Sequence, residues 1–350
     1  MNAALVSPAP LEVRLRTPAD DAAWDAFARV HPNGTFFHLS AWADVIERAF
    51  GHRSHYLLAC RRGAIEGVLP LVHLKSLLFG NALMSIPFGV YGGVLAANDA
   101  AANSLIDAAC ALARDLRVGY LELRNREPSD LDWPTRDLYA TFRKTLLPTE
   151  EANFRAIPKK RRAEVRKGIA AGLVSEVDAG PERLFAAYSE SVRNLGTPVF
   201  GQGYFREVLR AFGKDCEVLT VLHRGEAVAS VMSFYFRDEV LPFYGGGTAA
   251  ARDCQANDFL YWELMRRALA KGVRIYDYGR SKRGTGSFAF KEYWGFEPAP
   301  LHYQYYLVRA RELPNVSPAN PKYRMFIRAW QHLPLPVSRA VGPLLARSLG

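Results

Sequence analysis

The fold is decided by the stretch LPFYGGGTAA (241–250), DFLYWELMRRALAKG (258–272) and IYDYGR (275–280). An earlier stretch has the same order and reads IPFGVYGGVLAA (86–97), AANSLIDAACALARDLRVG (101–119) and YLELRN (120–125). Each stretch predicts a strand that ends in Tyr-Gly-Gly, an amphipathic helix that ends near glycine, and a further strand. The same number of residues separates the tyrosine from the helix-closing glycine in both copies. The chain therefore contains an internal repeat.

The repeat extends upstream of these stretches. Hairpins with an Arg-Gly turn precede both Tyr-Gly-Gly strands, in HYLLACRRGAIEGVLPLVHLK (55–75) and CEVLTVLHRGEAVASVMSFYFRDEV (216–240). Two helices precede each hairpin, predicted over 18–30, 39–50, 181–195 and 203–213. Each half of the chain thus has the order helix, helix, antiparallel strands, helix, strand, helix or loop, strand. We predict two similar domains, 10–147 and 148–310, followed by a basic extension over 311–350.

This order is similar to that of the GCN5-related N-acetyltransferase (GNAT) fold, and two copies in tandem resemble the FemAB family of aminoacyltransferases. The resemblance covers roughly residues 10–310 and also rests on FFHLSAW (36–42), RRAEVRKGIAAGL (161–173) and GSFAFKEYWGF (286–296). Within that family, the chain resembles the group associated with exosortase and PEP-CTERM exopolysaccharide systems. The resemblance implies a mixed α/β fold of two tandem domains, each a mostly antiparallel twisted sheet flanked by helices.

Composition excludes a disordered chain and indicates where anionic partners bind. The 350 residues are 49% hydrophobic, which is enough to fill cores, and carry a net charge of +10. Most of the excess lies in two segments, 154–170 and 309–350, and the rest of the chain is close to neutral. The charge therefore indicates two local contacts with phosphate groups, nucleic acid or a membrane surface rather than a uniformly basic protein.

The segment GSFAFKEYWGF (286–296) holds the predicted catalytic residues. Ordinary GNAT enzymes place a tyrosine four residues before the glycine of Y-x-x-x-G-F, and Lys291 occupies that position here. The resemblance to FemAB enzymes, which have a lysine in this helix, implies that Lys291 lies near the reacting carbonyl, where it offers three N–H donors to an oxyanion or a diphosphate. The alternative is a solvated surface lysine. Tyr293 is a second candidate acid or a cleft wall, and Asp277 is a candidate base, a residue that orients the amine, or a strand-end cap.

Substrate-binding candidates follow from charge and glycine. The loop GRSKRGTGS (279–287) combines glycines with cations, which suits a phosphate or nucleotide, although a surface turn has the same composition. The basic helix over 158–172 suits a tRNA acceptor stem or a sugar-nucleotide diphosphate, with a solvated helix face as the alternative. The predicted substrate-binding residues are Arg162, Arg166, Tyr244, Arg280, Lys282, Arg283, Gly284 and Gly286.

The acyl donor is predicted from a missing motif. GNAT enzymes bind the coenzyme A pyrophosphate with Q/R-x-x-G-x-G/A before the helix, but the two corresponding stretches read ARDCQAND (251–258) and ANDAAANS (97–104), without glycine. This favours aminoacyl-tRNA over acyl-CoA as the co-substrate, with no permanently bound cofactor. We predict an acyltransferase acting on an amine of a cell-envelope (peptidoglycan) or exopolysaccharide precursor. The alternatives are an acetyl-CoA-dependent N-acetyltransferase and a non-catalytic adaptor at a membrane-associated assembly.

Other patterns bear on location and exclude other enzyme classes. The four cysteines are widely spaced, no metal-ligand spacing occurs, and GxSxG, Walker A and HExxH motifs are absent. The N-terminus lacks the pattern of a signal peptide, so we expect a cytoplasmic protein. The uncharged run 76–98 contains Pro87 and four glycines, which predicts strands and turns rather than a membrane span. The tail 320–350 predicts either peripheral contact with the inner face of the membrane or packing on the protein body or on a second subunit.

Overall fold

The computed structural model describes residues 9–76, 80–314 and 321–349. It divides into two compact units. The first unit comprises Met1–Glu47, Gly51–Thr135 and His302–Leu313, and the second comprises Arg48–Phe50, Arg136–Leu301 and Pro314–Gly350. The predicted domains 10–147 and 148–310 are continuous in sequence, whereas these units are not. The difference arises because β10 (Tyr139–Thr145) belongs to a sheet of the second unit and β18 (His302–Leu307) to a sheet of the first.

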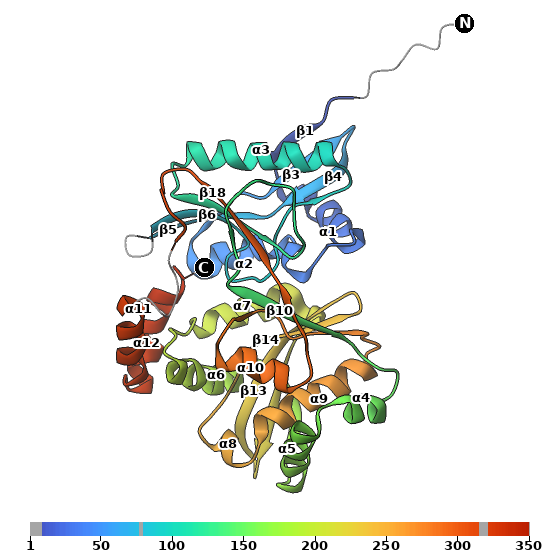
Figure 1. Cartoon of the computed structure of the whole chain (residues 1–350), viewed down its shortest axis with the longest axis vertical. Helices are drawn as coiled ribbons and strands as arrows, with labels where there is room; N and C mark the ends of the chain where they lie inside the picture. The colour runs from blue at the N-terminus through green and yellow to red at the C-terminus, as the bar shows by residue number, and fades with distance from the viewer. Residues whose placement is uncertain (1–8, 77–79, 315–320, 350) are drawn as a thin grey trace, which may run out of the picture. The chain divides into compact units, whose positions relative to one another are not determined.

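The first unit contains two sheets and three α-helices among its described residues. One sheet has the strand order β1-β3-β4-β7 and the other the order β2-β5-β6-β8-β18-β9. The strands are β1 (Glu12–Leu15), β2 (Arg53–Ser54), β3 (Leu57–Arg61), β4 (Ala64–Leu69), β5 (Leu71–Ser76), β6 (Gly80–Ser85), β7 (Leu95–Ala96), β8 (Tyr120–Asn125) and β9 (Thr135–Arg136). The helices are α1 (Asp21–Val30), α2 (Ala41–Phe50) and α3 (Asp99–Asp115), and α3 lies along the strands in Figure 1.

The second unit is built on one larger sheet with the strand order β11-β12-β13-β14-β15-β10-β16, and β17 pairs with β10. Its further strands are β11 (Val174–Asp178), β12 (Cys216–His223), β13 (Glu226–Phe236), β14 (Glu239–Gly247), β15 (Ile275–Asp277), β16 (Ser281–Lys282) and β17 (Pro298–Pro300). Its helices are α4 (Glu150–Ala156), α5 (Lys159–Ala170), α6 (Glu182–Leu195), α7 (Gln202–Phe212), α8 (Ala250–Asp253), α9 (Ala256–Ala270), α10 (Gly286–Tyr293), α11 (Pro321–Gln331) and α12 (Leu335–Ala346). The mixed, mostly antiparallel fold class is confirmed.

The internal repeat is visible in the backbone geometry. Both Arg-Gly turns have positive φ at both residues, as tight hairpins favour: 51° and 81° at Arg62-Gly63, and 53° and 84° at Arg224-Gly225. In the second unit β14 runs parallel to β15, and the connection between them passes through α8 and α9. In the first unit β6 runs parallel to β8, and the connection passes through the short strand β7, which belongs to the other sheet, and then α3. A parallel pair needs such a crossover connection.

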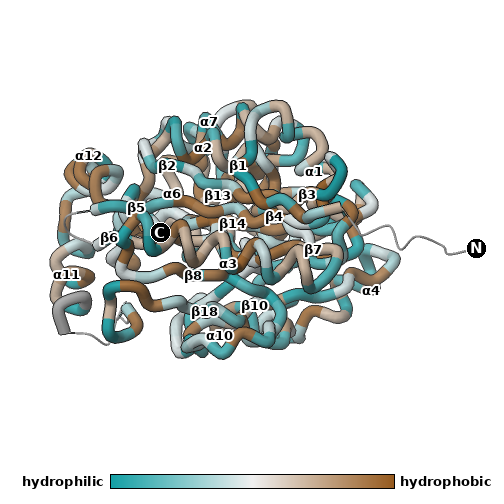
Figure 2. Tube along the Cα trace, turned by 90° about the horizontal axis from the view of Figure 1, so that it is seen from above, coloured by the Kyte–Doolittle hydropathy of each residue, from teal (hydrophilic) through white to brown (hydrophobic). Residues whose placement is uncertain are grey.

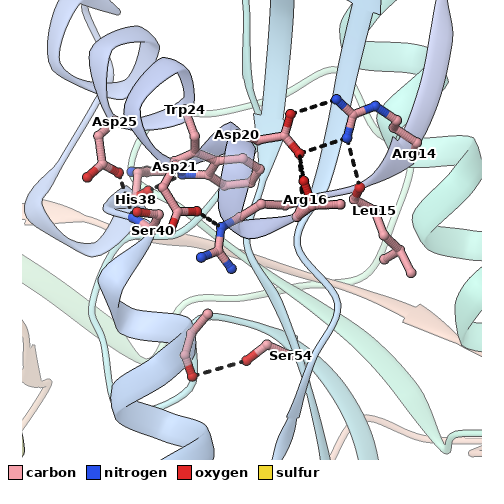
Figure 3. Close-up of polar contacts among 12 residues, drawn as sticks. Arg14, Leu15, Arg16, Asp20, Asp21, Trp24, Asp25, His38, Ser40 and Ser54 are labelled. Carbon is pink, nitrogen blue, oxygen red and sulfur yellow. Dashed lines mark hydrogen bonds and ion pairs between the residues drawn. The ribbon is translucent and has the colours of Figure 1, made fainter.

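In the first unit, side-chain hydrogen bonds join β1 to the turn before α1, and α1 to the segment 36–42 (Figure 3). Arg14 donates two hydrogen bonds, of 2.6 and 2.8 Å, to the carboxylate of Asp20. The indole N–H of Trp24 donates to the carbonyl oxygen of His38 at 2.6 Å. Trp24 is fully buried, so this bond satisfies its one polar group. It also ties α1 to the FFHLSAW segment.

Each unit has its own hydrophobic core, one mainly between α3 and the first-unit strands and one mainly around α9, β13 and β14. In Figure 2 the hydrophobic colour follows the central strands, including β4 and β13. Within the uncharged run 76–98, residues 80–98 form β6, turns and β7, which confirms strands and turns there; residues 77–79 lie outside the described residues. The prediction that the first Tyr-Gly-Gly (91–93) ends a strand is wrong, because these residues lie in irregular chain between β6 and β7, whereas the second (244–246) lies within β14. No helix in the described part of the chain has the length and apolar character needed to cross a bilayer.

Candidate functional site

Helix α10 holds Lys291, and local signals set both of its ends. Thr285 precedes the helix, and its hydroxyl accepts a hydrogen bond from Phe288 N at 3.4 Å. At the far end Gly295 has a φ of +76°, a conformation that favours glycine and ends the helix. Trp294 is 1% exposed and anchors this end, because its indole N–H donates to Asp258 at 3.0 Å. These contacts orient the face that carries Lys291.

Lys291 lies where two parallel strands separate. The parallel pairing of β14 with β15 is limited to Glu239–Ile275 and Val240–Tyr276. Just beyond the end of β15, the Lys291 Nζ donates to the carbonyl oxygens of Gly279 and Arg280, at 2.9 and 3.0 Å. A protonated lysine has three N–H groups, and the third has no hydrogen-bond partner among the described residues. Lys291 is thus a buried amine with one donor left over, and not a solvated surface lysine.

Burial changes the protonation of this amine. Lys291 is 8% exposed, and loss of solvation lowers the pKa of its ammonium to about 7. The negative charge of Asp277 acts in the opposite direction, and Arg280 adds to the lowering. Near neutral pH the side chain therefore exists in both protonation states. It can donate a proton to a reacting group or stabilise negative charge in that range.

This pKa predicts how stability depends on pH. The folded chain releases the Lys291 proton near pH 7, whereas the unfolded chain keeps it until about pH 10.5. Between these values the unfolded state binds more protons, so the unfolding free energy rises with pH. Urea unfolding should show the wild type gaining up to about 1.4 kcal/mol per pH unit relative to Lys291→Met in this window. Equal slopes for the two proteins would contradict the shifted pKa, and Lys214→Met, at an exposed position, serves as the control.

Asp277 is 2% exposed and is held by several partners. Its carboxylate accepts from the Gly279 backbone N–H at 2.7 Å and forms an ion pair with Arg143 Nε at 3.2 Å. Arg143, on β10, also pairs with Glu239 on β14. Of the roles that the sequence left open for Asp277, these contacts favour that of a strand-end residue that orders the loop and the charge around Lys291.

The first unit repeats this arrangement at the same strand position. Glu122, the third residue of β8, is 4% exposed and accepts from Arg124 Nε at 2.8 Å. Asp277 is likewise the third residue of β15. A buried carboxylate paired with arginine therefore occurs in both copies, which indicates that the position has a structural role in the fold.

The structure does not bring Tyr293 or Tyr244 to the Lys291 amine as hydrogen-bond partners. Tyr293 is on α10 but is 61% exposed, and Arg161 lies 5.6 Å from its ring centre. Tyr244 is 5% exposed within a cluster of aromatic rings, where its hydroxyl bonds with that of Tyr204 at 2.7 Å. Burial raises the pKa of the Tyr244 hydroxyl well above its ordinary value. A substrate role for either tyrosine stays a prediction.

The loop before α10 gathers the predicted cations. The Arg280 guanidinium lies 4.6 Å from the centre of the Tyr139 ring, and Arg283 pairs with Asp137 at 3.1 Å. Lys282 is on β16, and burial lowers the pKa of its ammonium. Gly284 has a φ of +75°, and no atom lies within 4 Å of an added Cβ at Gly284 or Gly286. Both glycines therefore face open space.

Helix α5 contacts α10 through Arg161, which sequence reasoning missed. Arg161 pairs with the buried Asp258 at 3.3 Å and lies 6.0 Å from the Phe290 ring centre. Arg162 has a buried Nε without a hydrogen-bond partner among the described residues, and Arg166 lies 5.4 Å from the Phe154 ring centre. The only sequence signal for the Arg161–Asp258 ion pair is that the two residues carry opposite charges. A single sequence does not show which oppositely charged residues form pairs in the fold.

Residues 251–258, which stand where GNAT enzymes have the coenzyme A motif, contribute to α8 and to a left-handed turn before α9. Gln255, with a φ of +59°, precedes α9. The backbone N–H groups of Ala251 and Arg252 donate to the carbonyl oxygens of Thr248 and Ala249. These two amides of α8 are therefore hydrogen-bonded within the protein, and the first N–H groups of α9 are not among them.

The tail packs on the second unit. Arg339 on α12 donates to the Ser189 hydroxyl on α6 at 2.8 Å, and Trp330 on α11 is 4% exposed. This confirms packing on the body for these helices; residues 315–320 and 350 lie outside the described part. Apolar side chains remain on the outer side, with Met325 73% and Leu344 62% exposed. Hydrophobic and hydrophilic colours alternate along both helices in Figure 2.

Comparison with known proteins agrees with the tandem fold. A family model described as "Acetyltransferase (GNAT) domain" matches residues 153–292, a range that includes α5 and most of α10. Residues 153–292 are a GNAT domain. A search of curated proteins found no match. Among solved structures, the chain resembles FemX at 15% identity, with a TM-score of 0.66 over 90% of this chain and all of that one.

Two other solved structures share the fold. One is a tandem GNAT protein from the clavulanic acid biosynthesis pathway, at 14% identity and a TM-score of 0.56 over 87% of this chain and all of that one. The other is L-PGS from Bacillus licheniformis, at 13% identity and a TM-score of 0.53 over 92% of this chain and 97% of that one. The FemAB-like tandem GNAT fold is thereby confirmed. Acyl transfer is the chemistry typical of the GNAT domain.

Proposed function

We propose that this tandem GNAT protein transfers an aminoacyl group from aminoacyl-tRNA to an amine of an anionic envelope or exopolysaccharide precursor. The choice of donor depends on the stretch 251–258. Pyrophosphate binding at a helix start needs free backbone N–H groups. Here the stretch has no glycine, and the amides of Ala251 and Arg252 are already hydrogen-bonded.

The proposed reaction is acyl transfer through a tetrahedral intermediate. The neutral amine of the acceptor attacks the ester carbonyl carbon, and the new C–N bond turns the carbonyl oxygen into an oxyanion. The third N–H of protonated Lys291 donates to that oxygen. Collapse of the intermediate breaks the C–O bond to the tRNA ribose. The proton lost by the attacking nitrogen ends on the leaving ribose oxygen, so the step balances without an added reagent.

The proposed partners are anionic. The cations of the loop 280–283 and of α5 would contact phosphates of the acceptor or of tRNA. The outer side of α11 and α12 combines exposed Met325 and Leu344 with basic residues, and residues 314–350 contain no acidic residue. We propose that this side contacts the inner face of the membrane when the acceptor is linked to lipid. The protein would then act in the cytoplasm at that surface.

An acetyl-CoA-dependent N-acetyltransferase is the second candidate, because the matching family model is an acetyltransferase domain. Titration of the full chain with acetyl-CoA and with bulk tRNA separates the two. We expect saturable tRNA binding that weakens with salt, and no saturation by acetyl-CoA in the usual Michaelis range of about 1 μM to 1 mM.

The matched variants are Arg162→Gln combined with Arg166→Gln, and Lys214→Gln as the control. The double variant should bind tRNA about tenfold more weakly, with a shallower salt dependence, because two phosphate contacts are lost. The control should bind like the wild type. Stoichiometric acetyl-CoA binding at micromolar concentration would contradict the proposed donor and favour acetyl-CoA instead. Equal tRNA binding by all three proteins would contradict the role of α5.

A further inference from the structure

The first unit contains a cavity that the proposed chemistry does not use. It measures about 360 Å³. It lies among the end of β8, the start of α3 and the segment that follows the first Tyr-Gly-Gly. Apolar side chains line part of it, including Ile106, Leu123 and Leu131. The polar lining includes Arg124 and Arg126, which stand two residues apart on and just after β8.

The two arginines differ in their partners. Arg124 is satisfied, because it donates to Glu122 and to the carbonyl oxygen of Gly89, each at 2.8 Å. Arg126 has a side chain only 12% exposed, yet its Nε and Nη1 are buried and have no hydrogen-bond partner among the described residues. Its ion pair with Glu127 joins Nε itself to a carboxylate oxygen at 3.5 Å, and that carboxylate is 59% exposed. Of these two nitrogens, Nη1 is therefore the buried donor that has no acceptor among the described residues. A guanidinium is always charged, so buried donors without acceptors are costly.

The cavity lining also includes the carboxylates of Asp99 and Glu127, but Nη1 of Arg126 makes no hydrogen bond to any described residue. His38 has both ring nitrogens occupied, by Thr35 Oγ1 at 2.8 Å and the Gly93 carbonyl oxygen at 2.9 Å. Burial and the charge of Arg126 lower the pKa of His38 to about 4, so its ring is neutral. The Tyr91 ring centre lies 5.8 Å from the Arg126 guanidinium and gives a cation–π contact but no acceptor for the N–H groups.

We propose that this cavity binds a small organic anion, whose carboxylate or phosphate accepts from Arg126 and whose short apolar part packs on Ile106, Leu123 and Leu131. The anion would supply the acceptor that Nη1 of Arg126 lacks. The apolar wall would favour a ligand with a short aliphatic chain over an inorganic ion. The proposal concerns the first unit alone and does not depend on the chemistry of Lys291, so either can fail without the other.

Calorimetric titration of the full chain with acetate, butyrate and inorganic phosphate tests the proposal. Butyrate should bind about tenfold more tightly than acetate, because two additional methylene groups are buried. Arg126→Gln should weaken butyrate binding at least tenfold, while Arg309→Gln, at an exposed first-unit position, should leave it unchanged. Ala102→Phe, which places a ring in the cavity and leaves Arg126 intact, should abolish binding.

Thermal unfolding without ligand separates binding from a structural role. If Arg126 is kept for a ligand, Arg126→Gln should be at least as stable as the wild type, and butyrate should raise the melting temperature of the wild type alone. The proposal is overturned if none of the three anions binds saturably. The proposal is also overturned if Arg126→Gln binds butyrate as tightly as Arg309→Gln does. The same holds if Arg126→Gln melts at a clearly lower temperature than Arg309→Gln. Binding of phosphate with none of butyrate would contradict the apolar contact.

Discussion

Replacing Lys291 by methionine is expected to lower the rate of acyl transfer by about 10²–10³-fold, the usual loss when one oxyanion donor is removed. The reason is geometric. Two N–H groups of Lys291 hold the carbonyl oxygens of Gly279 and Arg280, and in the proposed mechanism the third donates to the developing oxyanion. Methionine keeps most of the side-chain volume in this buried position, whereas alanine would also leave a void. Single-turnover rates with the identified donor measure the effect.

The control for this variant must separate chemistry from folding, because methionine also removes the donors to the two carbonyls. Circular dichroism and urea unfolding should show a folded protein at assay temperature. The rate loss should then appear in the chemical step of fully folded protein. Lys214→Met should retain wild-type rates, since that side chain is exposed. If Lys291→Met transferred at the full rate, or if its loss followed only the fraction unfolded, Lys291 would have no catalytic role.

The order of elements was predictable because it occurs twice. A helix or strand pattern that returns with equal spacing, as between the Tyr91 and Tyr244 regions, is far more informative than either pattern alone. That β10 pairs within the sheet of the second unit, and β18 within a sheet of the first, was not predictable in the same way. Both are short strands of ordinary β-forming residues. Their partners are decided by tertiary pairing over long sequence separations, which no local pattern encodes.

The candidate site was predictable in part. A motif position indicated Lys291, and the structure places it buried beside the strand end that carries Asp277. Two further properties follow only from three-dimensional contacts. Arg143 reaches Asp277 from a strand that precedes it by more than a hundred residues. Arg161, rather than Arg162 or Arg166, pairs with buried Asp258, because the direction of each side chain on a basic helix depends on how the helix packs.

Replacing Glu122 by alanine is expected to lower the unfolding free energy of the first unit by about 3–5 kcal/mol, the cost of leaving a buried charge without its partner. The Arg124 side chain is 2% exposed and that of Glu122 is 6% exposed, so water does not readily replace the lost carboxylate. The remaining acceptors of Arg124 are the neutral carbonyl oxygens of Ile86 and Gly89. Urea unfolding, followed by fluorescence and circular dichroism, measures the change.

Two further variants decide whether the cost comes from the unpaired charge or from the deleted side chain. Glu127→Ala removes a first-unit carboxylate that is 59% exposed and pairs with Arg126 at 3.5 Å, and it should cost less than about 1 kcal/mol. Glu122→Leu combined with Arg124→Met should recover most of the stability, because apolar residues of similar size can replace a buried ion pair. If the double variant were as unstable as Glu122→Ala, shape rather than charge would dominate. If Glu122→Ala lowered the unfolding free energy no more than Glu127→Ala, the buried Glu122–Arg124 pair would stabilise the first unit no more than the exposed pair does.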